Sequence, residues 1–126
     1  MVNKKQNPVH IPILKIDDFL IVSLHGQFND KSVLRLQDDI VKRVVRSKAK
    51  GVILDVSGLS VIDSFIARFI VQTAESSRTV GAKTVLTGIL PEMAMTIVEF
   101  GLNFKKVLTA LNLQKGIDLL RRNVLG

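Results

Sequence analysis

The sequence has no cysteine, and this absence excludes a disulfide framework, a thiolate metal site and a cysteine nucleophile. Tryptophan and tyrosine are also missing, and all six aromatic residues are phenylalanine. Aromatic platforms for stacking single-stranded nucleic acid are therefore not expected. The apolar stretches are only as long as strands, and no apolar core of a signal peptide follows the polar start at Met1–Asn7. These absences predict a cytoplasmic protein with no membrane partner.

The 126 residues suffice for one ordinary domain, and a content of 47% hydrophobic and 23% charged residues is typical of a globular chain. The charge balance is basic, with 18 lysine and arginine residues against 11 acidic ones and a net charge of +7. Such a balance favours acidic partners in general. The densest basic run, Lys42–Lys50, lies at the end of a predicted helix, where cations complement the helix dipole. We therefore interpret this run as a solvated helix end and expect no nucleic-acid partner.

Two strands are predicted near the start of the chain. Residues Ile11–Ile16 are predicted to form the first strand, and the proline within this range is typical of the edge of a sheet. The acidic pair Asp17-Asp18 supplies a tight turn into a second, more buried strand at Phe19–Leu24. These two strands are expected to form an antiparallel hairpin.

After the hairpin, the period of the apolar residues alternates between that of a helix and that of a strand. The predicted elements are a helix opened by Asn29 or Asp30, a strand at Val52–Val56, a helix from Asp63-Ser64 to Gly81, a strand at Thr84–Thr87, a helix from Pro91, a strand at Val107–Thr109 and a helix capped by Asn112. On the helix that starts at Pro91, four residues are predicted to face inwards, namely Met93, Ala94, Ile97 and Val98.

The predicted order is ββαβαβαβα, and this alternation of strands with crossover helices requires a mostly parallel sheet. The fold class is therefore α/β, with an N-terminal antiparallel edge hairpin and helices covering the sheet. Residues 1–8 are expected to be a loose arm, and residues 9–126 a single domain.

Conventional catalytic motifs are absent from the sequence. The segment around Ser64 lacks the glycines of a nucleophile elbow, and no glycine-rich phosphate loop is present. The only histidines, His10 and His25, flank the hairpin, which favours surface or strand-end positions over a catalytic base. Two histidines and scattered carboxylates give no metal-ligand spacing. We therefore expect a protein that is not an enzyme and that holds no metal or cofactor.

One alternative is a phosphoaspartate receiver, in which Asp55 at the end of a strand would accept the phosphate. Thr87 and the pair Lys105-Lys106 superficially match the hydroxyl residue and the lysine of such a site. The acidic pair Asp17-Asp18 lies in a hairpin turn, however, whereas sites of this type assemble at the carboxyl ends of parallel strands. A simpler interpretation of Asp55 is a strand-end residue that accepts hydrogen bonds from loop N–H groups.

Serine residues are concentrated between the buried strand at Val52–Val56 and the helix that follows it. Ser57, Ser60 and Ser64 lie in this link, and Asp63-Ser64 marks the predicted helix start. The free N–H groups and the positive end of the dipole at a helix start accommodate a phosphate. The structural interpretation remains open beside this one, because serine or aspartate at a helix start is usually only a cap worth about 1 kcal/mol.

Three segments carry a resemblance to a known family. Residues 51–68, GVILDVSGLSVIDSFIAR, resemble the signature of STAS domains, which are named for sulfate transporters and anti-sigma factor antagonists. Residues 81–89, GAKTVLTGI, and 91–98, PEMAMTIV, are similar to the RsbS-like scaffold subgroup found in stressosomes. The resemblance covers nearly the whole chain.

This resemblance implies a non-enzymatic scaffold in a large cytoplasmic shell, built by self-association and by co-assembly with RsbR-like STAS paralogues. Such shells sequester an RsbT-like serine/threonine kinase and release it when stress leads the kinase to phosphorylate the STAS domains; an RsbX-like phosphatase is a further implied partner. Because no sensor domain precedes the STAS segment, the RsbS-like type is favoured over the RsbR-like type.

Motif alignment with the family makes Ser64 the expected phosphoacceptor. Thr96 occupies a position where RsbR-like paralogues carry a phosphorylatable threonine, although an isolated RsbS-like domain is not expected to use it. The residues expected to contact a partner near the phosphate are Asp55, Ser60, Asp63 and Phe65.

Overall fold

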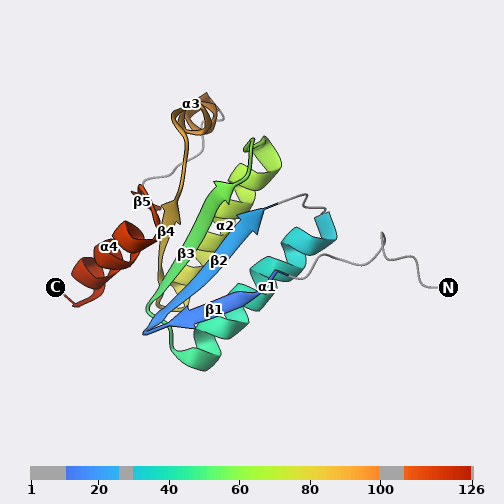
Figure 1. Cartoon of the computed structure of the whole chain (residues 1–126). Helices are drawn as coiled ribbons and strands as arrows, with labels where there is room; N and C mark the ends of the chain where they lie inside the picture. Colours follow the sequence, from blue (N-terminus) through green and yellow to red (C-terminus); the bar gives the residue numbers. More distant parts are fainter. Residues whose placement is uncertain (1–10, 26–29, 100–106, 126) are drawn as a thin grey trace.

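The computed structural model describes residues 11–25, 30–99 and 107–125. Within these ranges the predicted order ββαβαβαβα is confirmed, and Figure 1 shows its elements. The strands are β1 (Ile13–Ile16), β2 (Phe19–His25), β3 (Gly51–Gly58), β4 (Lys83–Thr87) and β5 (Leu108–Ala110), and the helices are α1 (Asp30–Ser47), α2 (Ser64–Thr79), α3 (Pro91–Glu99) and α4 (Leu113–Leu125). Some expectations fall outside the described residues, namely those for the arm at 1–8, His10, Asn29, Lys105 and Lys106.

The strands form one sheet in the order β1-β2-β3-β4-β5. The β1–β2 pair is antiparallel and the other pairs are parallel, as predicted for a hairpin at the edge of a parallel sheet. The hairpin turn is tight because Asp17 adopts a left-handed conformation, with φ of 54°. This topology places the carboxyl ends of β2 to β5 along one edge of the sheet, here called the carboxyl edge. The hairpin turn lies at the opposite, amino edge.

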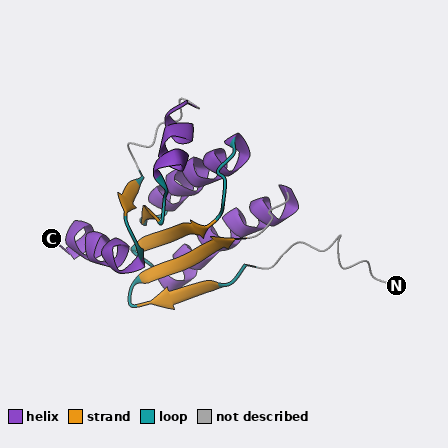
Figure 2. Ribbon diagram, turned by 45° about the horizontal axis from the view of Figure 1, so that its top comes forward, coloured by secondary structure: helices purple, strands orange, loops and turns teal. Residues whose placement is uncertain are grey.

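Helices cover both faces of the sheet, and each face has its own apolar cluster. Figures 1 and 2 show α1 and α2 on one face and α4 on the other. The α1/α2 face carries the larger cluster, to which β3 contributes Val52, Leu54 and Val56. The smaller cluster lies under α4 and consists of Phe19, Ile21, Ile53, Val85, Ile117 and Leu120. Because β3 supplies side chains to both clusters, its sequence is apolar without alternation up to Asp55.

The inward stripe predicted for α3 is only half right. Met93 and Ile97 are buried, whereas Ala94 is exposed and Val98 is 77% exposed. Figure 1 shows the reason, because α3 lies beyond the carboxyl end of β4 and does not lie along the sheet. A helix in this position contacts the core through a narrow stripe, so only one residue on each turn is buried.

Two helix-boundary predictions that rested on single residues, Asn112 and Gly81, are confirmed by the local geometry. The side chain of Asn112 caps α4 by accepting a hydrogen bond from the backbone N–H of Lys115, at 2.9 Å. Gly81 follows the end of α2 with φ of 97°, which is the left-handed conformation expected there. None of the helices in the described ranges has the length and apolarity needed to span a membrane.

Candidate functional site

The loop between β3 and α2 leads the chain from the sheet to the predicted helix start. Its path is set by two side chains, Leu59 and Ile62, which are buried in the larger apolar cluster. A turn closes at its beginning, where the N–H of Leu59 donates to the carbonyl of Val56 at 3.0 Å. Between these anchors Ser60 and Val61 are exposed. The loop therefore presents Ser60 and Val61 to solvent between two buried anchors.

Asp63 is the N-cap of α2, with an extended backbone at φ −88° and ψ 178°. Its Oδ1 atom accepts a hydrogen bond from the N–H of Ile66 at 2.9 Å, and its carbonyl accepts one from the N–H of Ala67 at 3.0 Å. The capping interpretation is thus correct for Asp63. Ser64 is the first residue of the helix and is not its cap.

Ser64 is exposed, and its hydroxyl forms no hydrogen bond to another described residue. Two exposed apolar side chains flank it along the chain, Val61 at 66% exposure and Phe65 at 40%. The free backbone N–H groups of the first helical turn and the positive end of the helix dipole lie at this point. A phosphate on Ser64 would be favoured by both, and no core side chain would have to move to admit it.

Asp55 occupies a separate polar cluster at the carboxyl edge of the sheet. Its Oδ1 atom accepts a hydrogen bond from the hydroxyl of Thr87 at 2.9 Å, and its Oδ2 atom accepts one from the hydroxyl of Ser57 at 2.7 Å. Asp55 and Thr87 are direct neighbours in the β3–β4 register. The expected loop N–H partners are thus replaced by two side-chain hydroxyls, because parallel pairing places Thr87 beside the carboxylate.

Gly88 closes this cluster from the end of β4. Its φ is +77°, and a Cβ atom built on it would lie 2.8 Å from Asp55 Oδ1 and 2.7 Å from Ser57 Cβ. A side chain at this position would therefore collide with the hydrogen-bonded pair. Gly88 was not among the residues predicted to form a site, and the available signal in the sequence is a glycine directly after the predicted strand at Thr84–Thr87.

We expect Gly88→Ala to lower the free energy of unfolding more than Gly81→Ala does. Both glycines have positive φ, so alanine costs about 1–3 kcal/mol of backbone strain at either position. Only Gly88 adds a collision, since nothing lies within 4 Å of a Cβ atom at Gly81. Urea denaturation of both variants measures the difference, and equal losses would contradict the close packing around Asp55.

The structure groups three of the four predicted partner-contact residues around Ser64. Ser60, Asp63 and Phe65 lie on the β3–α2 loop and the first turn of α2. Asp55 is separate, because alternation along β3 places its side chain on the same face as Ile53, the face that α4 covers. Helix α2 packs on the other face through Ala67, Phe69, Ile70 and Ala74.

Thr96 and His25 lie away from this group. Thr96 is half-buried in α3, and its hydroxyl donates to the carbonyl of Glu92 at 3.1 Å within the same helix. His25 is exposed at the end of β2 and pairs in register with Gly58. No hydrogen bond or ion pair joins its imidazole to another described residue.

The receiver arrangement is not assembled in the part of the chain that the structure describes. The Asp17-Asp18 turn lies at the amino edge of the sheet, with Asp17 Oδ2 paired to the Arg121 guanidinium at 2.7 Å. Asp55 lies at the opposite, carboxyl edge. Among the described residues, no three histidine or acidic side chains come together to hold a metal ion, which a receiver needs beside its aspartate.

A family model of the STAS domain matches residues 10–116. The chain belongs to the STAS domain family. The resemblance seen in residues 51–68 is thereby confirmed, and so is the α/β fold that it implied.

Within the STAS family, the chain is similar to proteins of stressosomes. It is 36% identical over 108 residues to the RsbT co-antagonist protein RsbRA of Bacillus subtilis (strain 168), a match covering 86% of this chain and 39% of RsbRA. The co-antagonist RsbRD of the same strain is 30% identical over 112 residues, covering 88% of this chain and 40% of RsbRD. The chain thus spans about two-fifths of the length of these curated relatives.

Two solved structures extend this similarity to nearly whole chains. A serine-to-glutamate variant of RsbS from Moorella thermoacetica has a TM-score of 0.84 and 35% identity, covering 94% of this chain and 100% of that chain. A chain of a solved stressosome has a TM-score of 0.80 and 38% identity, covering 89% of this chain and 97% of that chain. This STAS domain is therefore of the RsbR/RsbS-like, stressosome type.

Proposed function

We propose that this STAS domain is a non-enzymatic stressosome scaffold that sequesters an RsbT-like serine/threonine kinase and releases it when Ser64 is phosphorylated. The observation that carries the proposal is the position of Ser64, an exposed serine on the first turn of a helix that already has its cap at Asp63. The family motif in residues 51–68 and the likeness to a complete RsbS chain support it.

The proposed switch is electrostatic and leaves the fold in place. A phosphate adds about −1.5 to −2 charges and three acceptor oxygens beside the Asp63 carboxylate. The helix start tolerates this charge locally, since its N–H groups and dipole favour anions. The same charge weakens the binding of a kinase docked over Ser64, because like or desolvated charges at an interface oppose binding. Phosphorylation therefore weakens the complex and does not unfold the domain.

The partner is proposed to contact the exposed side chains around Ser64. Phe65 and Val61 offer apolar area next to the hydroxyl, and Ser60 and Asp63 offer polar groups on either side. An aromatic side chain flanked by polar residues is typical of an energetically important contact. In this arrangement the kinase covers the apolar pair while its active site reaches Ser64.

The remaining partners are proposed from the family resemblance and from the similarity to the co-antagonist proteins. RsbR-like STAS paralogues are proposed to co-assemble with this domain into a cytoplasmic complex in which it also contacts copies of itself. An RsbX-like phosphatase would remove the phosphate and restore kinase binding. The domain itself needs no cofactor or metal in this role.

Phosphosite mapping tests the proposal. After incubation of the protein with a cognate RsbT-like kinase and ATP, we expect mass spectrometry to find phosphate on Ser64 as a stable phosphoester. Thr96 should remain unmodified, because the residue is half-buried and its hydroxyl donates a hydrogen bond to the carbonyl of Glu92 within α3. Phosphorylation of Thr96 in place of Ser64 would contradict the assignment.

The receiver alternative gives a different chemical result in a parallel incubation. Acetyl phosphate and Mg²⁺ would form an acyl phosphate on Asp55 that acid and base both hydrolyse. We expect none, because both carboxylate oxygens of Asp55 accept hydrogen bonds from Thr87 and Ser57. An acyl phosphate on Asp55 with no phosphate on Ser64 would overturn the scaffold proposal.

A further inference from the structure

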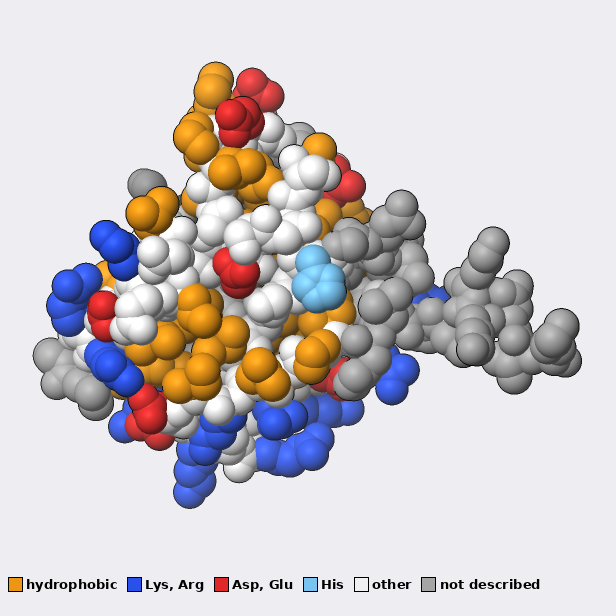
Figure 3. Space-filling view, in the orientation of Figure 1, with side chains coloured by type: hydrophobic (Ala, Val, Ile, Leu, Met, Phe, Trp, Pro, Cys, Tyr) orange, Lys and Arg blue, Asp and Glu red, His pale blue; other side chains and the backbone are white. Residues whose placement is uncertain are grey.

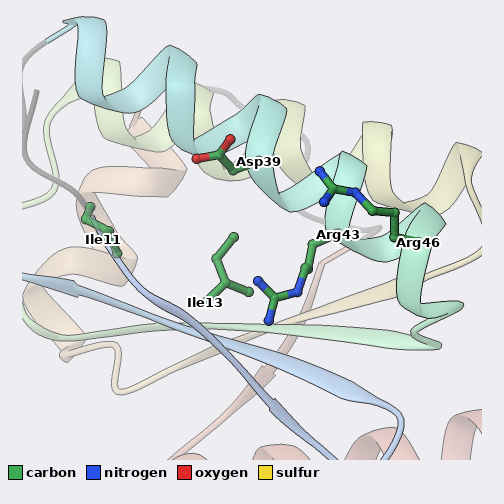
Figure 4. Close-up of a pocket in the computed structure, with 5 residues that line it drawn as sticks. All are labelled: Ile11, Ile13, Asp39, Arg43 and Arg46. Atoms are coloured by element: carbon green, nitrogen blue, oxygen red, sulfur yellow. The ribbon is translucent and has the colours of Figure 1, made fainter.

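A pocket lies between α1 and the edge strand β1, away from the Ser64 site. Its volume is about 200 Å³, and it is lined by Ile11, Ile13, Asp39, Arg43 and Arg46. Figure 4 shows Arg43 reaching from α1 towards Ile13, with Arg46 and Asp39 on neighbouring turns of the same helix. The pocket thus combines an apolar floor from the strand with charged groups from the helix.

The two arginines of this pocket have no ionic partner among the described residues. The ion pairs there are Lys42 with Asp38 at 2.8 Å and Arg121 with Asp17 at 2.7 Å, and neither involves Arg43 or Arg46. Two guanidinium groups one turn apart therefore present their donors to whatever enters the pocket. A guanidinium matches the geometry of a carboxylate, which accepts two parallel hydrogen bonds from it.

The strand that borders the pocket has an open side. β1 is the first strand in the sheet order and pairs only with β2 among the described strands. Within the described ranges, the backbone N–H and C=O groups on its outer side therefore have no partner strand. Such an edge is a template for an added extended segment.

We propose that the β1 edge and the Arg43/Arg46 pocket form a docking site for an acidic extended peptide segment of a partner protein. The segment adds to β1 by backbone hydrogen bonds. Its acidic side chains pair with Arg43 and Arg46 on the face of β1 that carries Ile13. Its alternate, apolar side chains lie on the opposite face, next to Leu14 and Ile16, which are exposed there. Figure 3 shows hydrophobic side chains gathered over the sheet on this face. The site is independent of Ser64, so it is a second attachment point and not part of the phosphorylation switch.

The chemistry of the pocket favours an acidic peptide over the other occupants. A nucleic acid would bring its bases to a site that has isoleucines and no aromatic side chain on which they could stack. The residues before Ile11 carry Lys4 and Lys5, whose charge has the same sign as that of the two arginines. An acidic strand can pair its carboxylates with the guanidinium groups and its backbone with the outer edge of β1.

The test uses the full chain and a fluorescent peptide of about ten residues that alternates glutamate and valine, so that carboxylates line one face of an added strand. Fluorescence anisotropy at matched ionic strength measures its affinity. We expect the double variant Arg43→Gln/Arg46→Gln to bind about tenfold more weakly than the parent, because two charge pairs are lost. The matched control Lys31→Gln/Arg35→Gln removes the same charge from exposed positions on α1 outside the pocket and should change affinity less than about threefold.

A second measurement reports on strand addition. Amide hydrogen exchange at Ile13–Ile16 should slow when the peptide is added and should not slow with a lysine–valine peptide of equal length. An equal loss of peptide affinity in the two double variants would overturn the proposal. Peptide binding without slower amide exchange in β1 would also overturn it. Tighter binding of a single-stranded oligonucleotide with the same dependence on Arg43 and Arg46 would assign the site to phosphates instead.

Discussion

Replacing Ser64 by alanine should leave the protein folded and bound to the RsbT-like kinase, but unable to release it when ATP is added. The hydroxyl is exposed and Asp63 supplies the helix cap, so the free energy of unfolding should change by less than about 0.5 kcal/mol. Release fails because no phosphate can be added at this position. Co-elution of kinase and scaffold before and after ATP measures the effect.

Ser64→Asp should behave in the opposite way. A carboxylate at a helix start suits the dipole, so the fold is retained. The added charge opposes a docked kinase, and we expect affinity to fall by about tenfold, which corresponds to about 1.4 kcal/mol. One carboxylate carries less charge than a phosphate, so the enzymatically phosphorylated protein should bind more weakly still.

Gln72→Glu is the matched control for this charge. Gln72 is exposed on α2, two turns beyond Ser64, and the variant gains one negative charge on the same helix. Its kinase affinity should stay within about twofold of the parent at physiological ionic strength. If Gln72→Glu weakens binding as much as Ser64→Asp does, the effect is one of net charge and the Ser64 switch is wrong.

Ile62→Ala should be the most destabilising of the substitutions in the β3–α2 loop. Ile62 is 1% exposed and belongs to the larger apolar cluster, which joins the loop to the α1/α2 face of the sheet. Removing its side-chain carbons leaves a cavity where the surrounding helices and strands cannot fully collapse. The expected loss is about 2–5 kcal/mol in the free energy of unfolding.

The neighbouring residue provides the control for Ile62. Val61 is 66% exposed, so Val61→Ala should change stability by about 0.5 kcal/mol or less. Urea denaturation compares the free energies of unfolding of the two variants directly, provided that both have the same dependence on urea concentration. Similar losses at both positions would mean that the loop is not anchored by Ile62, and that the exposed position of Ser64 is not set by the core beneath it.

The order of the elements could be predicted because it depends on local patterns. The acidic turn at Asp17-Asp18, the capping residue Asn112 and Gly81 at the end of α2 each act within a few residues of chain, through backbone conformation or a short hydrogen bond. The apolar run of β3 likewise reports burial on both faces without reference to any other segment. The antiparallel hairpin and the parallel order of the remaining strands follow from these local patterns.

The stripe on α3 was predicted less well because it depends on where that helix lies. Periodicity marks apolar residues without saying how wide a face the rest of the protein will cover. On α2 the covered face is wide and buries Ala67, Phe69, Ile70 and Ala74. On α3 it is narrow, and Val98 stays exposed although it fits the period.

The sequence by itself determined the fold class, the helix start at Asp63-Ser64 and the family signature around them, because each is written in contiguous residues. Only the tertiary structure decided that Asp55 and Ser64 lie in two separate polar sites. Parallel pairing of β3 with β4 places Thr87 beside Asp55 and holds that carboxylate on the α4 face of the sheet. Burial of Ile62 turns Ser64 outwards at the start of α2, the helix on the other face of the sheet. Neighbours that are separated by 32 residues along the chain meet only when the sheet forms, so no local pattern contains that division.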